Sequence, residues 1–166
     1  MEKGIFVNQN GCIPYAELIA KALKPYETRS KNMLSALVGE RVYIIRTKRN
    51  KKPTIIGQAT IEYGFFVKAE CFDAYRKLTF IPEGSSYDCH GKGKWLYKMG
   101  NAEECEPFEL PADAIRHGRS WCEFDMPDMM SDCTGECDSC PHRKRVPGDI
   151  DRIDREPAYF CDYSKH

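Results

Sequence analysis

Five of the nine cysteines in this 166-residue chain fall in its last third, and three of them are closely spaced. Cys133, Cys137 and Cys140 form a C-x3-C-x2-C pattern in CTGECDSC, and Cys161 follows in YFCDY. Four thiolates are a preferred tetrahedral ligand set for structural zinc. Four cysteines also hold iron-sulfur clusters. The pattern therefore predicts a metal site, with zinc as the first choice, an iron-sulfur cluster as the alternative and metal-free thiols third.

Two further residues are reserve ligands for this metal. His142 follows Cys140 by two positions and can replace Cys161, whereas Cys122 is expected to be packed within a strand. Residues 126–166 contain too few apolar side chains to build a core alone, and we expect metal binding to fold them.

A second candidate site lies near the N-terminus, where Lys24, Glu27 and Arg29 fall within six positions. A lysine meets a phosphate as a point charge, an arginine offers a planar fork, and a carboxylate accepts from an exocyclic amine. The combination predicts a binding site for RNA or a modified nucleotide. The alternative is an internal salt bridge in which Glu27 only holds the two cations in place.

Other polar and aromatic residues extend the predicted ligand site. Aromatic rings stack on bases, and a glutamine amide can read an amide-like edge. The tryptophans have packing in the core as their alternative role. If the protein is an enzyme, Lys24 would assist a nucleophile or stabilise an oxyanion, and Glu27 or Glu62 would be the general acid or base. The predicted ligand-binding set is Lys24, Tyr26, Glu27, Arg29, Ser30, Gln58, Trp95, Arg119 and Trp121.

Positive charge is concentrated in one region although the formal net charge of the chain is zero. Ten basic and two acidic residues lie between Lys21 and Lys52, a pattern that suits polyanions. Within that region, RTKRNKKP is expected to be the solvated tip of a hairpin.

Hydrophobic periodicity places these residues on short elements. The strands at 41–47 and 54–66 should pair as a hairpin. Periodicity ends near residue 125, which predicts a domain at 1–125 and a cysteine-rich module at 126–166. Short strands with two helices imply an α+β fold, a small mixed barrel with helices at its ends. The predicted helices span 14–24 and 70–78, and the predicted strands span 41–47, 54–66, 94–101 and 118–124.

The segment PYAELIAKALKPYETRSKNMLSALVGERVYIIRT resembles the opening of an ASCH domain, a family of small PUA-like β-barrels. The likeness continues through KWLYKMGN and HGRSWCEF, and it covers roughly residues 5–125. It includes Pro14, Lys24, Glu27, Arg29 and Gly39. The resemblance implies a PUA-like barrel that binds RNA or a modified nucleotide at the charged segment.

Some ASCH proteins are amidohydrolases that act on N4-acylated cytidine, and the resemblance extends to their lysine at Lys24. Glu27, however, occupies the position of their threonine, and Thr28 is one residue out of register. A hydrolase acting on a modified nucleoside or small amide is therefore the alternative function, and enzymatic activity is left open. A protein-interaction adaptor is the second alternative.

Several classes of protein are disfavoured by composition. No apolar run reaches the roughly 18 residues of a membrane span, and the N-terminus lacks the pattern of a secretory signal. Without that signal, nine cysteines argue against a disulfide scaffold. We therefore expect a cytoplasmic protein that does not contact membranes.

Overall fold

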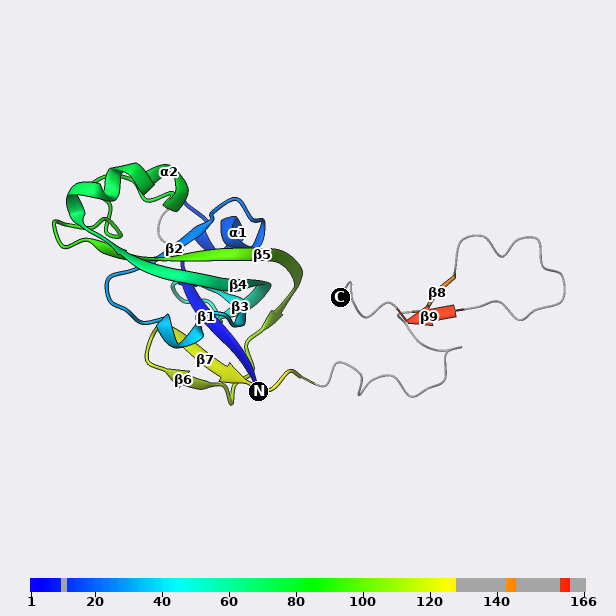
Figure 1. Cartoon of the computed structure of the whole chain (residues 1–166). Helices are drawn as coiled ribbons and strands as arrows, with labels where there is room; N and C mark the ends of the chain where they lie inside the picture. The colour runs from blue at the N-terminus through cyan, green and yellow to red at the C-terminus, as the bar shows by residue number, and fades with distance from the viewer. Residues whose placement is uncertain (10–11, 128–142, 146–158, 162–166) are drawn as a thin grey trace. The chain divides into compact units, whose positions relative to one another are not determined.

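The structure, a computed structural model, describes residues 1–9, 12–127, 143–145 and 159–161. The chain divides into two compact units, Met1–Asp125 and Met126–His166. The second unit contains a two-stranded hairpin of β8 (Arg143–Arg145) and β9 (Tyr159–Cys161). The described part of the first unit is a seven-stranded sheet with short helices (Figure 1). Its strands are β1 (Glu2–Asn8), β2 (Tyr26–Arg29), β3 (Arg41–Thr47), β4 (Thr54–Val67), β5 (Lys94–Glu109), β6 (Ile115–His117) and β7 (Trp121–Phe124).

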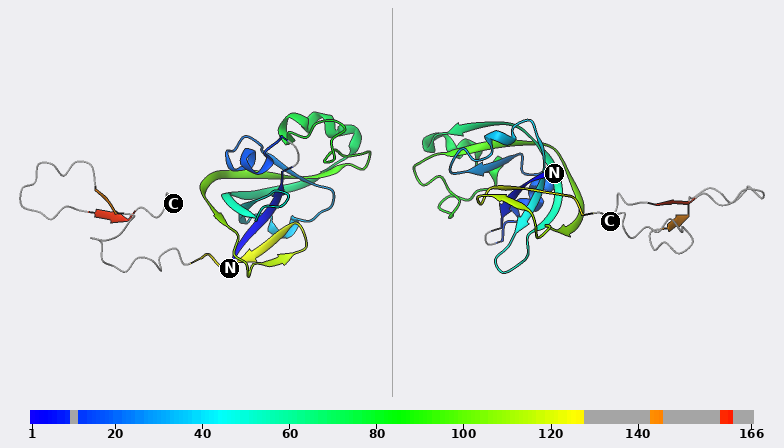
Figure 2. Two further views of the ribbon diagram at one scale, coloured as in Figure 1. Left: turned by 180° about the vertical axis from the view of Figure 1, so that it is seen from behind. Right: turned by 90° about the horizontal axis from the view of Figure 1, so that it is seen from below.

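The strands follow the order β2-β5-β4-β3-β1-β7-β6, and only β1 and β3 are parallel neighbours. The other adjacent pairs are antiparallel, so the sheet is mixed, as predicted. Two views from other directions show its strong curvature and the long strands β4 and β5 that cross it (Figure 2). The α+β class is confirmed.

The prediction of a closed barrel is wrong, because the sheet is open. Strands β2 and β6 are its two edges and do not pair with each other. Each is short, and a side chain rather than a backbone ladder connects β2 to β1. Arg29 Nη2 donates to the carbonyl oxygen of Phe6 at 2.7 Å. This side-chain contact connects β2 to β1, which do not pair through their backbones.

The predicted hairpin of β3 and β4 is confirmed, with Arg41 opposite Thr60 and Arg46 opposite Thr54. Its register shifts between Ile44 and Ile45, and both isoleucines are buried, each in a different hydrophobic cluster. The predicted strand at 94–101 extends to Glu109, because it pairs along nearly all of β4. Strands β1, β2 and β6 were not predicted from the sequence.

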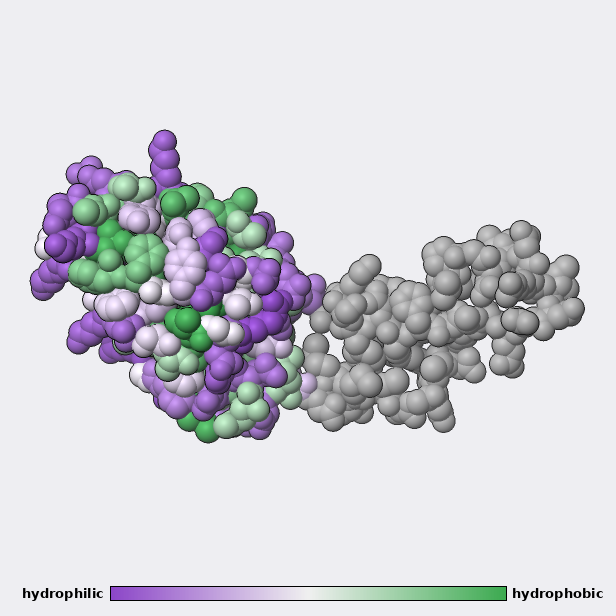
Figure 3. Space-filling model, in the orientation of Figure 1, coloured by the Kyte–Doolittle hydropathy of each residue, from purple (hydrophilic) through white to green (hydrophobic). Residues whose placement is uncertain are grey.

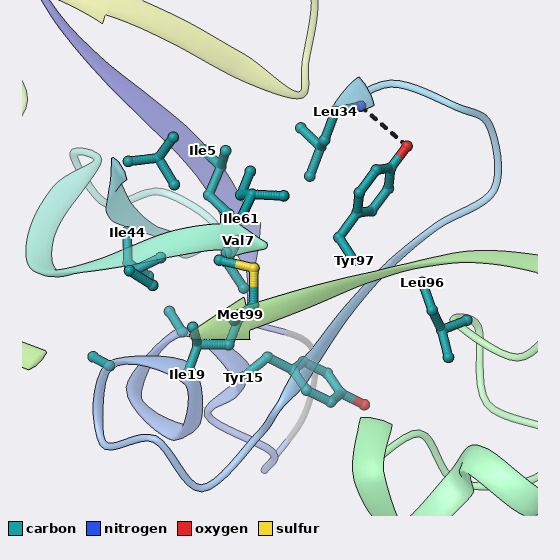
Figure 4. Close-up of a cluster of buried hydrophobic side chains, with 14 of the residues drawn as sticks. Ile5, Val7, Tyr15, Ile19, Leu34, Ile44, Ile61, Leu96, Tyr97 and Met99 are labelled. Atoms are coloured by element: carbon teal, nitrogen blue, oxygen red, sulfur yellow. Dashed lines mark hydrogen bonds between the residues drawn. The ribbon is translucent and has the colours of Figure 1, made fainter. Parts of the chain in front are cut away.

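The sheet buries apolar side chains on both faces, because successive residues of a strand point to opposite sides. In β1, Ile5 and Val7 belong to the larger hydrophobic cluster, whereas Phe6 belongs to a second cluster with Phe124. In the larger cluster, the buried Tyr97 hydroxyl accepts a hydrogen bond from the Leu34 N–H at 3.2 Å (Figure 4). The core therefore includes a polar contact that fixes the chain before β3.

The helices are shorter than predicted. Helix α1 (Tyr15–Ala20) ends before Ala22, which has a left-handed backbone conformation (φ 57°), and the N–H groups of Leu23 and Lys24 donate to the Leu18 carbonyl. This tight exit directs Lys24 towards β2. A 3-10 turn, η1 (Ser35–Leu37), precedes β3.

The predicted helix at 70–78 is two consecutive pieces, the 3-10 segment η2 (Ala69–Tyr75) and the α-helical turn α2 (Arg76–Thr79). Phe72 is buried beneath them, whereas Leu78 and Phe80 are exposed. Hydrophobic side chains accordingly reach the surface over this segment (Figure 3). No helix in the described ranges is long and apolar enough for a membrane span.

Candidate functional site

Lys24, Glu27 and Arg29 form a chain of ion pairs, which we call the charge triad. Lys24 Nζ donates to Glu27 Oε2 at 2.8 Å, and Glu27 Oε1 lies 2.6 Å from Arg29 Nη1. Glu27 and Arg29 alternate with their neighbours along β2 and so share one face of it. The tight exit from α1 adds Lys24 to that face. The three charged groups therefore lie together, and Glu27 also forms the internal salt bridges that the sequence offered as the alternative.

The triad is shielded from solvent. The side chains of Lys24, Glu27 and Arg29 are 1%, 6% and 15% exposed. Burial lowers the pKa of the Lys24 ammonium, although Glu27 opposes this shift. Burial alone would raise the pKa of Glu27, but Lys24 and Arg29 together bring it below its ordinary value. Glu27 is therefore ionised between two cationic partners.

The triad lines a pocket that is open to solvent, with about 330 Å³ of empty space when the solvent at its mouth is counted. The pocket is lined by Val7, Asn8, Tyr15, Lys24, Glu27, Thr28, Arg29, Ile81 and Tyr87.

Two tyrosines form an aromatic wall of this pocket. The rings of Tyr15 and Tyr87 meet edge to face, with centroids 5.6 Å apart, and Lys24 Nζ lies 5.7 Å from the centroid of Tyr15. Burial raises the pKa of both phenols, so their hydroxyl groups keep their protons at neutral pH. The pocket thus combines apolar ring surface with hydroxyl groups and fixed charges.

One of the three guanidinium nitrogens of Arg29 has no hydrogen-bond partner among the described residues. Its Nη1 and Nη2 atoms contact Glu27 and the carbonyl of Phe6, whereas its buried Nε has no partner among the described residues. A buried N–H group without a partner is unfavourable unless a ligand or water completes it. Because Arg29 lines the pocket, this N–H is a candidate donor to a ligand.

Tyr26 and Gln58 do not line the pocket. Tyr26 packs edge to face on Phe65 and Tyr75, and its hydroxyl lies 3.1 Å from that of Tyr63, a contact that raises the pKa of Tyr26 to about 12. Gln58 Oε1 accepts from Arg41 Nε at 2.7 Å. The side chains of Tyr26 and Gln58 therefore contact other residues of the domain, outside the pocket lining.

The remaining predicted residues also lie outside the pocket lining. Trp95 pairs with Arg29 across β5 and β2 but stacks on Tyr97, 6.4 Å away between centroids. Trp121 stacks on His117 at 3.8 Å. The structure brings together only the triad from the predicted ligand set. Ser30, Glu62 and Arg119 are exposed.

Sequence reasoning missed most of the pocket wall and one buried cation beside it. Lys94 is only 9% exposed, and burial lowers the pKa of its ammonium while Glu27 opposes that shift. Asn8, Tyr15 and Tyr87 carry no local motif, so no sequence signal singles them out. They meet only because β1, α1 and the loop after α2 converge at this point.

The predicted metal ligands lie in the cysteine-rich module. Cys133, Cys137, Cys140 and the reserve ligand His142 lie outside the described residues, and Cys161 lies in β9. Within the described residues, no three histidine, cysteine or acidic side chains form a metal-binding group. Cys122 is fully buried in β7, and burial raises the pKa of its thiol to about 11, so it packs as a neutral side chain.

The open mixed sheet, the helical segment between β4 and β5 and the pocket at β2 define an ASCH-like α+β domain. Among solved structures, a point mutant of the ASCH protein from Zymomonas mobilis is 22% identical, with a TM-score of 0.53, over 66% of this chain and 74% of that chain. This similarity shows the fold and confirms the resemblance expected from the sequence.

The structure of the unmutated Zymomonas mobilis protein is 19% identical over 64% of this chain and 73% of that chain, with a TM-score of 0.49. No family model and no curated protein sequence matches the chain.

Proposed function

We propose that the domain binds RNA or a modified nucleotide, with one nucleoside in the pocket that the charge triad lines. The observation that carries this proposal is the burial of three ionisable side chains at the wall of an open pocket. A buried ion pair is often no more stabilising than well-packed apolar side chains of the same volume, and ionisable groups with shifted pKa values cluster at functional sites. The ASCH-like fold supports the same class of ligand through the resemblance.

The pocket offers groups that complement a nucleobase. The free Nε–H of Arg29 suits a carbonyl oxygen, and the Glu27 carboxylate suits an exocyclic amino group. Tyr15 and Tyr87 offer ring surface to the base. A base that carries both a carbonyl and an amino group, as cytosine does, would use all of these contacts.

Isothermal titration calorimetry with cytidine, N4-acetylcytidine, cytidine monophosphate and a short single-stranded RNA tests this proposal. We expect binding of at least one ligand, weakened about tenfold or more in Arg29→Gln, because a charge-assisted hydrogen bond is worth about 1.5–3 kcal/mol. Arg41→Gln is the matched control, since Arg41 pairs with Glu103 on the exposed side of the sheet.

Asn8→Ala provides a second pocket variant in case Arg29→Gln does not fold, because Asn8 is exposed and lines the pocket. Binding that is weaker in Asn8→Ala but not in Arg41→Gln supports the pocket. If no ligand binds the wild-type protein, or if both pocket variants bind like the wild type, the proposal is wrong.

A hydrolase acting on a modified nucleoside or small amide is a second candidate, favoured by the presence of Lys24 in the pocket lining. The Lys24 ammonium would stabilise an oxyanion there. Thr28 lines the same pocket and is a candidate hydroxyl nucleophile, whereas Glu62 lies outside the pocket lining. Chromatography of N4-acetylcytidine after incubation tests turnover. Product that forms with wild type but not with Thr28→Val would make the protein an enzyme with Thr28 as its nucleophile.

We also propose that Cys133, Cys137, Cys140 and Cys161 bind a structural zinc ion. The hairpin of β8 and β9 supports this, because it pairs Arg143 with Cys161 and Arg143 follows Cys140 by only three residues. An iron-sulfur cluster is the alternative for the same thiolates.

A further inference from the structure

The turn between β3 and β4 carries positive charge that the pocket does not include. Lys48, Arg49 and Lys51 are exposed, and none of them has a salt-bridge partner in the described part of the chain. We call these three side chains the basic turn. Because the whole chain has a formal charge of zero, they form a local concentration of charge rather than part of a basic surface overall. Such a concentration attracts polyanions.

The basic residues on either side of the turn are neutralised. Arg46 Nη1 lies 3.0 Å from Glu17 Oε1, and Lys52 Nζ lies 2.7 Å from Glu109 Oε2. These two ion pairs connect the base of the hairpin to α1 and to β5. The uncompensated charge is therefore confined to the three side chains of the basic turn.

The backbone of the turn keeps the three cations close together. The Lys51 N–H donates to the Lys48 carbonyl at 3.2 Å, and Asn50 adopts a left-handed conformation with φ 59°. Asparagine tolerates this conformation better than most residues. An open groove beside the turn holds about 900 Å³ of empty space, and Lys48 and Lys51 line it. The groove gives an extended anion access to both ammonium groups.

Strands β1 and β3 place the basic turn beside the pocket. Val7 and Asn8 line the pocket and pair in parallel register with Arg46 and Thr47, the last two residues of β3. The Thr47 hydroxyl also donates to the Val7 carbonyl at 3.3 Å. The basic turn begins at the next residue. One edge of the pocket is therefore formed by β1, and the basic turn follows β3, its neighbour in the sheet.

Helix α1 makes the same connection on another side. Tyr15 lines the pocket, and Glu17, two residues further along α1, pairs with Arg46 at the base of the hairpin. This edge of the pocket and the basic turn therefore both lie at the carboxyl ends of β1 and β3, near the first turn of α1.

We infer that the basic turn binds the phosphates of an RNA strand whose nucleoside occupies the pocket, an inference that rests on the proposed function. Three exposed cations on one turn, of which Lys48 and Lys51 line an open groove, exceed what the single phosphate of a mononucleotide needs. An acidic protein segment would also be attracted, but the adjacent aromatic pocket suits a base. The turn therefore specifies a polymeric ligand.

The experiment compares two variants of the full chain with equal changes in charge. In the first, Lys48→Gln, Arg49→Gln and Lys51→Gln remove the basic turn. In the second, three exposed lysines that follow β4 are replaced in the same way, as a control for net charge. The control substitutions are Lys68→Gln, Lys77→Gln and Lys92→Gln.

Fluorescence anisotropy with a fluorescein-labelled single-stranded RNA of about twelve nucleotides is measured over a series of salt concentrations. Each phosphate contact on a single strand contributes about 0.7 to the slope of log K against log salt. In the variant without the basic turn, we expect the magnitude of this slope to fall by about 2 and the affinity at low salt to fall at least about tenfold. In the control variant, both the slope and the affinity should change less.

Two further ligands separate the sources of the negative charge. Cytidine monophosphate should bind the variant without the basic turn nearly as well as it binds wild type, because its nucleoside uses the pocket. Polyglutamate should compete poorly with the labelled RNA. If removal of the basic turn weakens the binding of cytidine monophosphate as much as it weakens the binding of RNA, the turn binds a free nucleotide and the polymer inference is wrong. If polyglutamate competes strongly with the RNA, the turn binds an acidic protein and the inference is also wrong.

Failure of this inference is distinguishable from failure of the proposed function. If Asn8→Ala weakens RNA binding but removal of the basic turn changes neither slope nor affinity, the inference about the turn is wrong and the pocket stands. If removal of the turn weakens binding while both pocket variants bind normally, the strand contacts the turn without using the pocket, and the linked inference is wrong.

Discussion

Lys24 Nζ lies 2.8 Å from Oε2 of Glu27, with the two side chains only 1% and 6% exposed. Transfer of both charges from water costs several kcal/mol, and their attraction offsets this cost only with good geometry and further hydrogen bonds. Lys24 also donates to the Tyr26 carbonyl, and Glu27 contacts Arg29. These contacts retain a charged pair in the interior, where it lines a pocket.

Breaking this pair by one substitution should be strongly destabilising. We expect Lys24→Met to lower the free energy of unfolding by about 3–5 kcal/mol, because it leaves the Glu27 carboxylate with one cation fewer. Lys24→Met combined with Glu27→Leu should cost less than the sum of the single changes. Urea denaturation measures all three variants. The exposed pair of Lys52 and Glu109 is the control, with a coupling of about 0–1 kcal/mol. Additive effects at Lys24 and Glu27 would contradict the arrangement.

Stability should fall in acid because of Asp88. Burial alone would raise its pKa, but the N–H of Gly84, Arg76 and the N–H of Cys89 lower it well below the ordinary value of 3.8. The stabilisation is therefore complete above the ordinary pKa and is lost as pH falls towards the lowered one. Glu27, whose pKa is also lowered, adds to the same acid limb.

Urea midpoints measured from pH 7 down to pH 2 test this dependence. Asp88→Asn should be less stable than wild type at pH 7, and the difference between the two proteins should shrink below about pH 4. A difference that stays constant over the whole range would show that ionisation of Asp88 is not responsible.

Loss of the Tyr97 hydroxyl should be costly. This buried hydroxyl donates to Asn32 Oδ1 at 2.7 Å and accepts from the Leu34 N–H at 3.2 Å. Tyr97→Phe should lower the free energy of unfolding by about 1–3 kcal/mol, because it leaves that N–H without a partner. Tyr63→Phe, at a 46% exposed residue, is the control and should cost about 0.5 kcal/mol or less. Equal effects in thermal unfolding would contradict the role of Tyr97.

The cysteine-rich module should contain metal. We expect about one zinc per chain in protein purified under reducing conditions, because four cysteines complete a tetrahedral site. Elemental analysis should show loss of that zinc in Cys137→Ser but not in Cys12→Ser, where an exposed thiol is replaced. Iron with labile sulfide would identify the cluster instead, and equal metal content in both variants would exclude Cys137 as a ligand.

Local sequence patterns determined several elements correctly. The alternation in RVYIIRT and TIIGQATIEYGFF predicted β3 and β4 and their pairing, because adjacent segments with a two-residue period form hairpins. The same reasoning missed β1 and β2. No strand was predicted in the charged segment, but residues Tyr26–Arg29 form an edge strand because they pair with β5, far away in sequence. Such long-range pairing overrides local preference.

The sequence by itself determined which groups have the chemistry for a site, since the spacing of Lys24, Glu27 and Arg29 already indicated three interacting charges. Only the tertiary structure decided that these charges are buried and line a pocket. Ile81 and Tyr87 reach that pocket from a distant segment, and Asn8 reaches it from β1. Tyr26, Gln58 and Trp95 lie elsewhere because alternation along a strand and pairing between strands place each side chain, and both depend on the assembled sheet.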